Sequence, residues 1–83
     1  MTKKDILYHL LYQAFIDIRL YSHEGKGIQG IFKISDLMHN LPLKLSKAES
    51  DDDFDDIYDR LIERAEMKKC TSWIDNAISR KVD

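Results

Sequence analysis

The sequence predicts an all-α domain, a compact bundle of about four helices in which the first and third are long and the second and fourth short. Its apolar residues recur at the three- and four-residue spacing of helices that bury one face. One proline and three glycines among 83 residues are too few for the turn-dense plan of a small sandwich or barrel. The hydrophobic share of 43% is too high for a disordered tail. We therefore expect residues 1–83 to form one helical domain.

The first predicted helix covers residues 6–21. Thr2 is expected to cap its amino end, with Asp5 reaching back to the cap, and Gly25 and Gly27 mark a point beyond its end. The row facing the core is Ile6, Leu7, Leu10, Leu11, Ala14, Phe15, Ile18 and Tyr21. A thin polar stripe runs beside this row at a spacing of four residues, which brings its members within hydrogen-bond reach of one another: His9, Gln13 and Asp17.

The second predicted helix covers residues 28–41 and ends before Pro42, because proline disfavours a helical residue ahead of it. Its buried side consists of Ile31, Ile34, Leu37, Met38 and Leu41. Beyond the proline, Leu43 and Leu45 alternate with Lys44. We expect a connector here that lays these two leucines on the core.

Ser50 is expected to cap the third helix, whose first turn of aspartates faces the unpaired amides and the positive end of the helix dipole. This helix should lie antiparallel to the first, and its apolar stripe is Phe54, Ile57, Tyr58, Leu61, Ile62 and Ala65. The short fourth helix should begin at Ser72, with Asp75 completing a capping box, and should turn inward Trp73, Ile74, Ala77 and Ile78.

These patterns together predict the composition of the core. Its members should be Leu7, Leu10, Leu11, Ala14, Phe15, Ile18, Leu37, Leu41, Phe54, Ile57, Leu61 and Trp73.

A cytoplasmic location follows from cysteine usage and hydropathy. The single cysteine, Cys70, excludes an internal disulfide, which a secreted domain of this size would normally need. The longest stretch without Lys, Arg, Asp or Glu is residues 6–16, far shorter than the roughly 20 residues of a spanning helix. We expect no membrane association. The sequence as a whole resembles those of small helical bacterial proteins. This resemblance implies no activity.

The charge is unevenly distributed. The formal net charge of -2 combines +2 over residues 1–45 with -4 over residues 46–83. Residues 49–59, here called the acidic segment, hold seven acids and no base. Asp51, Asp53 and Asp55 occupy the first, third and fifth positions of a calcium loop, but Asp56 and Ile62 stand where that loop needs glycine and glutamate. We interpret the acidic segment as a helix start with a solvated face, or as a patch that docks a basic partner.

The remaining chemistry of the sequence is sparse. The three histidines, His9, His23 and His39, are 14 and 16 residues apart, so no pair has the spacing of metal ligands on one helix. Lys68, Lys69 and a nearby helix start would lower the pKa of the Cys70 thiol. No base or orienting group accompanies the thiol, so we expect no catalytic residues, no metal, no cofactor and no small-molecule substrate.

Residues 33–41, Lys-Ile-Ser-Asp-Leu-Met-His-Asn-Leu, carry one family resemblance. Over these nine residues the chain resembles the aspartate-bearing segment of the guanosine-polyphosphate hydrolases with an HD-type metal site, which would make Asp36 a metal ligand. That family also needs an upstream histidine and an adjacent His-Asp pair on other helices, and the sequence has no His-Asp dipeptide. We interpret the segment as a helix end, and we expect the protein not to be an enzyme.

A second apolar row on the first helix is the most unusual feature of the sequence, because a surface helix needs only one stripe. Either this helix is enclosed on nearly all sides or the row faces a partner. The predicted partner-binding residues are this row and part of the acidic segment: Tyr8, Tyr12, Ile16, Leu20, Asp52, Asp55, Asp56 and Asp59.

The function predicted from these features is that of a small non-catalytic, cytoplasmic protein-interaction module of adaptor, inhibitor, antitoxin or immunity type. It would bind a protein partner or associate with itself as a homodimer. The alternative is a DNA-associated regulator that forms a basic face on dimerisation from Lys3, Lys4, Arg19, Lys26, Lys33 and Lys44. The acidic third helix makes nucleic acid the less favoured partner.

Overall fold

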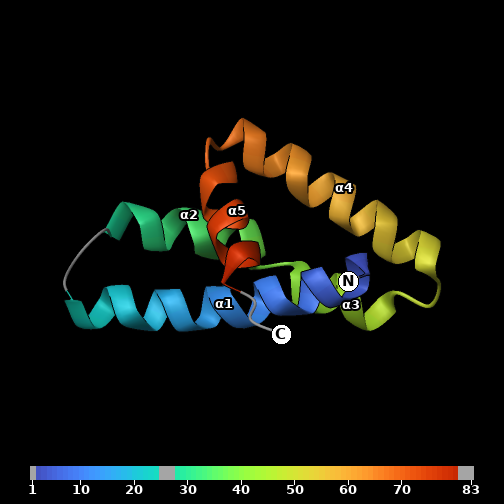
Figure 1. The fold of residues 1–83 in the computed structure, drawn as a ribbon, viewed down its shortest axis with the longest axis horizontal. Helices are drawn as coiled ribbons and strands as arrows, with labels where there is room; N and C mark the ends of the chain where they lie inside the picture. The colour runs from blue at the N-terminus through green and yellow to red at the C-terminus, as the bar shows by residue number, and fades with distance from the viewer. Residues whose placement is uncertain (1, 25–27, 81–83) are drawn as a thin grey trace.

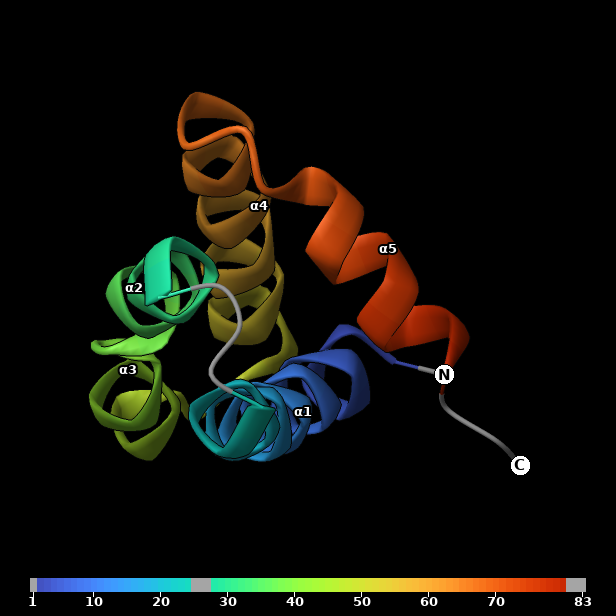
Figure 2. The same ribbon diagram turned by 90° about the vertical axis from the view of Figure 1, so that its left-hand side faces the viewer.

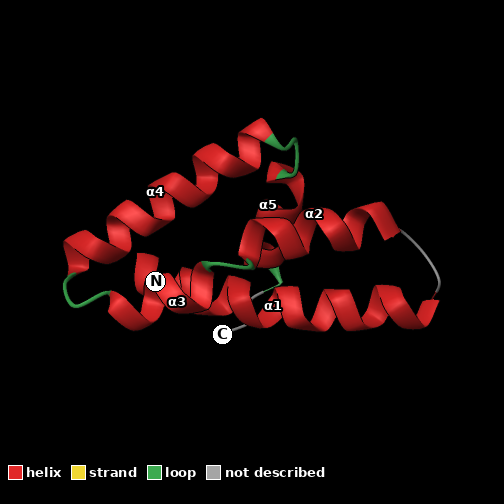
Figure 3. Cartoon of the chain, turned by 180° about the vertical axis from the view of Figure 1, so that it is seen from behind, coloured by secondary structure: helices red, strands yellow, loops and turns green. Residues whose placement is uncertain are grey.

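The computed structural model describes residues 2–24 and 28–80, and all regular structure within them is helical (Figures 1 and 3). The helices are α1 (Lys3–Glu24), α2 (Ile28–Met38), α3 (Leu41–Lys47), α4 (Asp51–Met67) and α5 (Thr71–Ser79). The all-α prediction is confirmed, with α1 and α4 as the long helices and α2 and α5 as the short ones. The extra helix is α3, which occupies the predicted connector.

The helices pack around α1, which lies along the lower edge of the molecule in Figure 1. α2 runs back along α1, α3 continues in the direction of α2, and α5 descends from the end of α4 to α1. In Figure 2, α2 and α3 lie on one side of the molecule and α5 lies on the other.

The expected antiparallel arrangement of the two long helices is wrong. α4 runs in the same general direction as α1 and rises obliquely away from it (Figure 1). The Lys3 ammonium nitrogen is 3.2 Å from a carboxylate oxygen of Asp59, which places the start of α1 beside the first half of α4. The reason is that α2 and α3 together return the chain to the amino end of α1 before α4 begins.

Pro42 lies in the first turn of a helix and does not directly follow the end of one. α2 stops at Met38, three residues earlier than expected, and Pro42 lies in the first turn of α3, where the missing N–H of proline would have no helical partner in any case. Leu45 is buried, as predicted. Leu43 is 57% exposed, because two residues along a helix point to different sides whereas alternate residues of an extended chain share one side.

Two of the three predicted caps are confirmed. In α1, Asp5 N–H donates to Thr2 Oγ1 at 3.2 Å and Thr2 N–H donates to Asp5 Oδ2 at 3.3 Å. In α4, Ser50 and Asp53 form the same reciprocal pair, at 3.3 and 3.2 Å.

The predicted start of the last helix at Ser72 is wrong. α5 begins at Thr71, its cap residue is Cys70, and no side chain caps it. α4 ends in a tight reversal: Lys69 has a φ of 58°, and the N–H groups of Cys70 and Lys69 donate to the carbonyls of Ala65 (2.9 Å) and Glu66 (3.1 Å). This Schellman motif packs Cys70 against the end of α4 and so fixes where α5 can start.

Most of the predicted core is confirmed. The buried cluster is Leu7, Leu10, Ala14, Ile34, Leu37, Met38, Leu41, Leu45, Phe54, Leu61, Ala65, Cys70, Ile74 and Ala77. The partly buried predicted members packed against it are Leu11, Ile18, Ile57 and Trp73.

Phe15 was predicted in the core, and this is wrong, since it is 69% exposed. The cause is the rotation of α1 about its axis. α5 docks on the side of α1 that carries His9 and Asp17, so the buried arc extends toward that side and leaves Phe15 in solvent.

Candidate functional site

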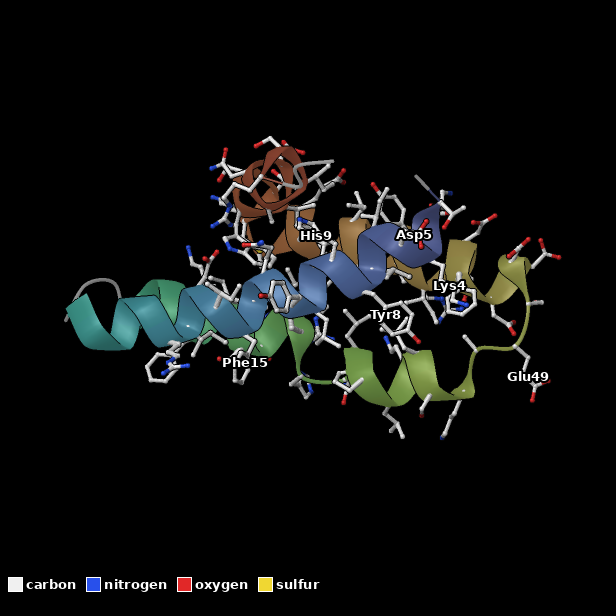
Figure 4. The ribbon with its side chains drawn as sticks, turned by 60° about the horizontal axis from the view of Figure 1, so that its bottom comes forward. Lys4, Asp5, Tyr8, His9, Phe15 and Glu49 are labelled. Atoms are coloured by element: carbon white, nitrogen blue, oxygen red, sulfur yellow. The ribbon has the colours of Figure 1, made fainter. Side chains whose placement is uncertain are left out.

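The most exposed apolar feature of α1 is a row of three aromatic side chains, Tyr8, Tyr12 and Phe15, here called the aromatic stripe. Their exposed fractions are 47%, 63% and 69%. Spacings of four and three residues place them on one face of the helix. Tyr8 and Phe15 project from the side of α1 nearer α2 and α3, whereas His9 points to the opposite side (Figure 4).

The exposure of this face excludes the sequence interpretation in which α1 is enclosed on nearly all sides. The helix is not enclosed on all sides, because Tyr8 and Tyr12 are open to solvent. Ile16 is half-buried, and the side chain of Leu20 lies outside the described residues. Phe15 was missed as part of this face because its spacing fits both the core row and the exposed row.

Two basic residues flank the aromatic stripe. Lys4 lies one turn before Tyr8 and Arg19 lies one turn after Phe15, and both are exposed. The Lys4 ammonium nitrogen is 5.2 Å from the centroid of the Phe54 ring on α4, a cation–π arrangement. Lys3 makes a similar contact with Tyr58 at 5.3 Å, so both lysines tie α1 to α4.

The predicted acidic residues of α4, Asp52, Asp55, Asp56 and Asp59, are all exposed. Asp59 pairs with Lys3, and Asp56 Oδ2 is 3.1 Å from Arg60 Nε. Asp53 accepts hydrogen bonds from the backbone N–H groups of Glu49 (2.9 Å) and Ser50 (3.2 Å), which hold the pKa of its carboxyl below the ordinary value. Glu49 points away from α1 (Figure 4).

The structure therefore separates the predicted partner-binding residues into two surfaces. The aromatic stripe follows α1, and the acidic side chains follow the first turns of α4. The acidic surface borders the amino end of α1, where a pocket is lined by Thr2, Lys3, Lys4, Asp51, Phe54 and Asp55.

One buried carboxylate holds α5 against α1. Asp17 is 3% exposed, and its two oxygens accept from Arg80 Nη1 at 2.9 Å and Nη2 at 2.8 Å. Trp73 Nε1–H donates to Asp17 Oδ2 at 2.7 Å. The Arg80 hydrogen bonds hold the pKa of the Asp17 carboxyl below its ordinary value, against the opposing effect of burial.

His9 adds a second link between the same helices. Its Nε2 lies 2.7 Å from the carbonyl oxygen of Ala77, so Nε2 carries the proton in this contact. The predicted polar stripe of α1 is thus a docking strip for α5. The signal in the sequence was an acid beside the apolar row of the first helix, together with a tryptophan and an arginine in the last segment.

Asp36, the aspartate of the hydrolase-like segment, lies in a group of cations. It pairs with Lys68 across to α4, and its Oδ1 is 3.7 Å from Arg64 Nη2. The hydrogen bond from Lys68 is the main cause that lowers the pKa of the Asp36 carboxyl. The aspartate is therefore occupied in an ion-pair cluster that joins α2 to α4.

The predicted lowering of the Cys70 thiol pKa is wrong. Cys70 is buried, and burial raises its pKa above the ordinary value, an effect that the charges of Lys33 and Lys68 oppose only in part. The Schellman reversal is the cause, because it turns this residue into the core.

Within residues 2–24 and 28–80, no cluster of three or more His, Cys, Asp or Glu side chains is placed to hold a metal ion. No helix in the described part of the chain is both long and apolar enough to cross a bilayer. Comparisons with protein-family models, with curated proteins and with solved structures returned no match.

Proposed function

We propose that this protein is a small non-catalytic interaction module of the cytoplasm that binds a protein partner through the aromatic stripe of α1. The observation that carries the proposal is the exposure of three aromatic side chains along one helix face. A fully buried aromatic side chain covers about 150–250 Å². At the observed exposures, Tyr8, Tyr12 and Phe15 leave roughly 270–450 Å² of ring surface open to solvent.

Such an area favours a contact role over a solvated surface. The largest apolar patch on a typical monomer is about 300–600 Å², and such patches are often functional. Tyrosine and phenylalanine are enriched in interfaces because a ring buries much surface while ordering few rotatable bonds. Met67, Phe32 and Leu43 are also exposed, at 80%, 67% and 57%. Each of these lies on a different helix, and single exposed apolar residues are common.

The acidic face of α4 supports a second part of the proposal, the attraction of a basic partner. Asp52 and Asp55 are exposed, and within the described residues neither takes part in an ion pair. Charges of this kind mainly raise the rate of encounter and select the partner. This arrangement suits a module of adaptor, inhibitor, antitoxin or immunity type, which acts by occupying another protein.

No specific observation favours the DNA-associated regulator. Of its six proposed basic residues, Lys26 lies outside the described residues. Lys3 and Lys4 are engaged with α4, while Lys33 lies on α2 and Lys44 lies on α3. These six residues therefore give no support to a common basic face.

The proposal is tested by affinity capture from a lysate of the source organism, with mass spectrometry, run beside light scattering of the purified protein. The baits are the wild type, a Tyr12→Ser/Phe15→Ser variant, and Met67→Ser as a matched control that removes an exposed apolar side chain elsewhere. We expect the wild type and Met67→Ser to share a specific association, with the same chain or another protein, which the double variant loses. Equal behaviour of all three baits would contradict the proposal.

A further inference from the structure

The side chains along the exposed face of α1 are arranged almost symmetrically. Tyr8 and Phe15 are equally distant in sequence from the midpoint between residues 11 and 12, and so are Lys4 and Arg19. Tyr12 lies beside this midpoint, and all five side chains are exposed. Read in either direction, the face presents a cation, an aromatic ring, a central tyrosine, a second ring and a second cation.

We infer that the occupant of this face is a second copy of the chain, with the two α1 helices packed antiparallel about a twofold axis near Tyr12. The inference rests on the proposed function and names the partner of the aromatic stripe. A twofold interface requires a surface that complements itself. The antiparallel arrangement meets this need, because Tyr8 of one copy faces Phe15 of the other and the two Tyr12 rings meet at the axis.

The area available is suitable for such a contact. A standard protein interface buries about 800 Å² on each partner. The three rings supply roughly a third to a half of that area, and the aliphatic stems of Lys4 and Arg19 extend the face at both ends. α1 lies along the lower edge of the molecule in Figure 1, with α2, α4 and α5 above it, and Figure 2 shows α3 beside it. A second α1 can therefore approach from the lower side, which these helices leave open.

The charges favour the antiparallel direction over the parallel one. Parallel packing would set Arg19 against Arg19 of the second copy. Antiparallel packing sets the second copy's Arg19 opposite Lys4, but Asp51 and Asp55 line the surface beside Lys4 and offset the repulsion between these two cations. Arginine near these carboxylates is attractive, so the acidic start of α4 would set the direction of pairing.

The self-association is tested by sedimentation equilibrium over a concentration series. We expect a reversible dimer for the wild type and for Met67→Ser. Phe15→Ser and Tyr12→Ser should each raise the dimer dissociation constant by about tenfold or more, as the loss of a central aromatic side chain does in other interfaces. Both substituted residues are exposed in the single chain, so an unchanged far-ultraviolet circular dichroism spectrum should accompany the effect.

The direction of pairing is tested by oxidative cross-linking with cysteines at the two ends of the face. Lys4→Cys and Arg19→Cys proteins are mixed in equal amounts, each with Cys70→Ala to remove the native thiol. The antiparallel dimer predicts that the mixed disulfide between residues 4 and 19 predominates. Predominance of like-with-like disulfides would overturn the inferred direction.

The outcomes distinguish this inference from the proposed function. A chain that stays monomeric at about 1 mM while its aromatic stripe captures a different protein would overturn the dimer and leave the interaction module standing. A dimer whose affinity is unchanged by Phe15→Ser and Tyr12→Ser would place self-association on another face, and would overturn the inference.

Discussion

The Asp17 carboxylate is the interaction whose removal most sharply tests how α5 is held on α1. Asp17→Asn keeps the shape of the side chain and can still accept the Trp73 N–H, but it removes the charge that two Arg80 nitrogens contact at 2.8 and 2.9 Å. Hydrogen bonds to charged groups contribute about 1.5–3 kcal/mol to stability. The Arg80 side chain is 43% exposed and can regain water, so we expect a loss near the lower end, about 1.5–2 kcal/mol.

Urea denaturation followed by tryptophan fluorescence measures this loss directly, because Trp73 is the only tryptophan and bonds to Asp17. The pH dependence provides a second readout. The folded-state pKa of Asp17 is lowered, so its stabilising effect is present above the unfolded value of about 3.9 and is lost as the pH falls through the folded value. The difference in stability between wild type and Asp17→Asn should therefore be constant near neutral pH and should shrink in acid.

Asp56→Asn is the matched control, since it removes an exposed carboxylate that pairs with Arg60 one helical turn away. Such a pair contributes only a few tenths of a kcal/mol, about 0.3–0.5. If Asp17→Asn costs no more than Asp56→Asn, or if its effect is the same at every pH, the described role of Asp17 is wrong.

Three further substitutions and one chemical reaction test other parts of the fold. Leu10→Ala should lower the free energy of unfolding by about 2–5 kcal/mol because Leu10 is fully buried. Phe15→Ala, measured by urea denaturation in dilute protein, should change it by no more than about 0.5 kcal/mol. Similar losses for the two variants would show that Phe15 packs in the core. Lys69→Gly should stabilise the domain by about 0.5–1 kcal/mol, because its φ of 58° penalises a residue with a Cβ atom, and a loss in thermal melting would refute this. Cys70 should react with iodoacetamide much more slowly in the native protein than in urea, since burial raises its pKa; equal rates would place the thiol at the surface.

The parts of the fold that could be predicted from the sequence are those with local causes. The amphipathic rows of α1 and α4 and the caps at Thr2 and Ser50 depend on residues only three or four positions apart. Pro42 was misinterpreted because proline is compatible both with the end of one helix and with the first turn of the next. The choice depends on whether Leu41 and Leu45 can reach the core together, which is a property of the whole fold.

The candidate site was predictable only in part, for a related reason. Tyr8 and Tyr12 stood out because they exceed what one buried stripe needs. Phe15 could not be assigned to the buried or the exposed row, since its position on the helix borders both. Which row it joins depends on how far the docking of α5 on Asp17 and His9 rotates α1. The direction of α4 relative to α1 was likewise set by α3, a helix that the sequence pattern did not reveal.

The most direct test of the central claim, that the aromatic stripe of α1 is a contact surface for a second copy of the chain, is a dilution series followed by two-dimensional NMR of the uniformly labelled protein. The account predicts concentration-dependent chemical shifts that are largest at Tyr8, Tyr12 and Phe15 and small around Met67. Spectra that do not change with concentration, or that change most on α4, would contradict the account of this face as the site of self-association.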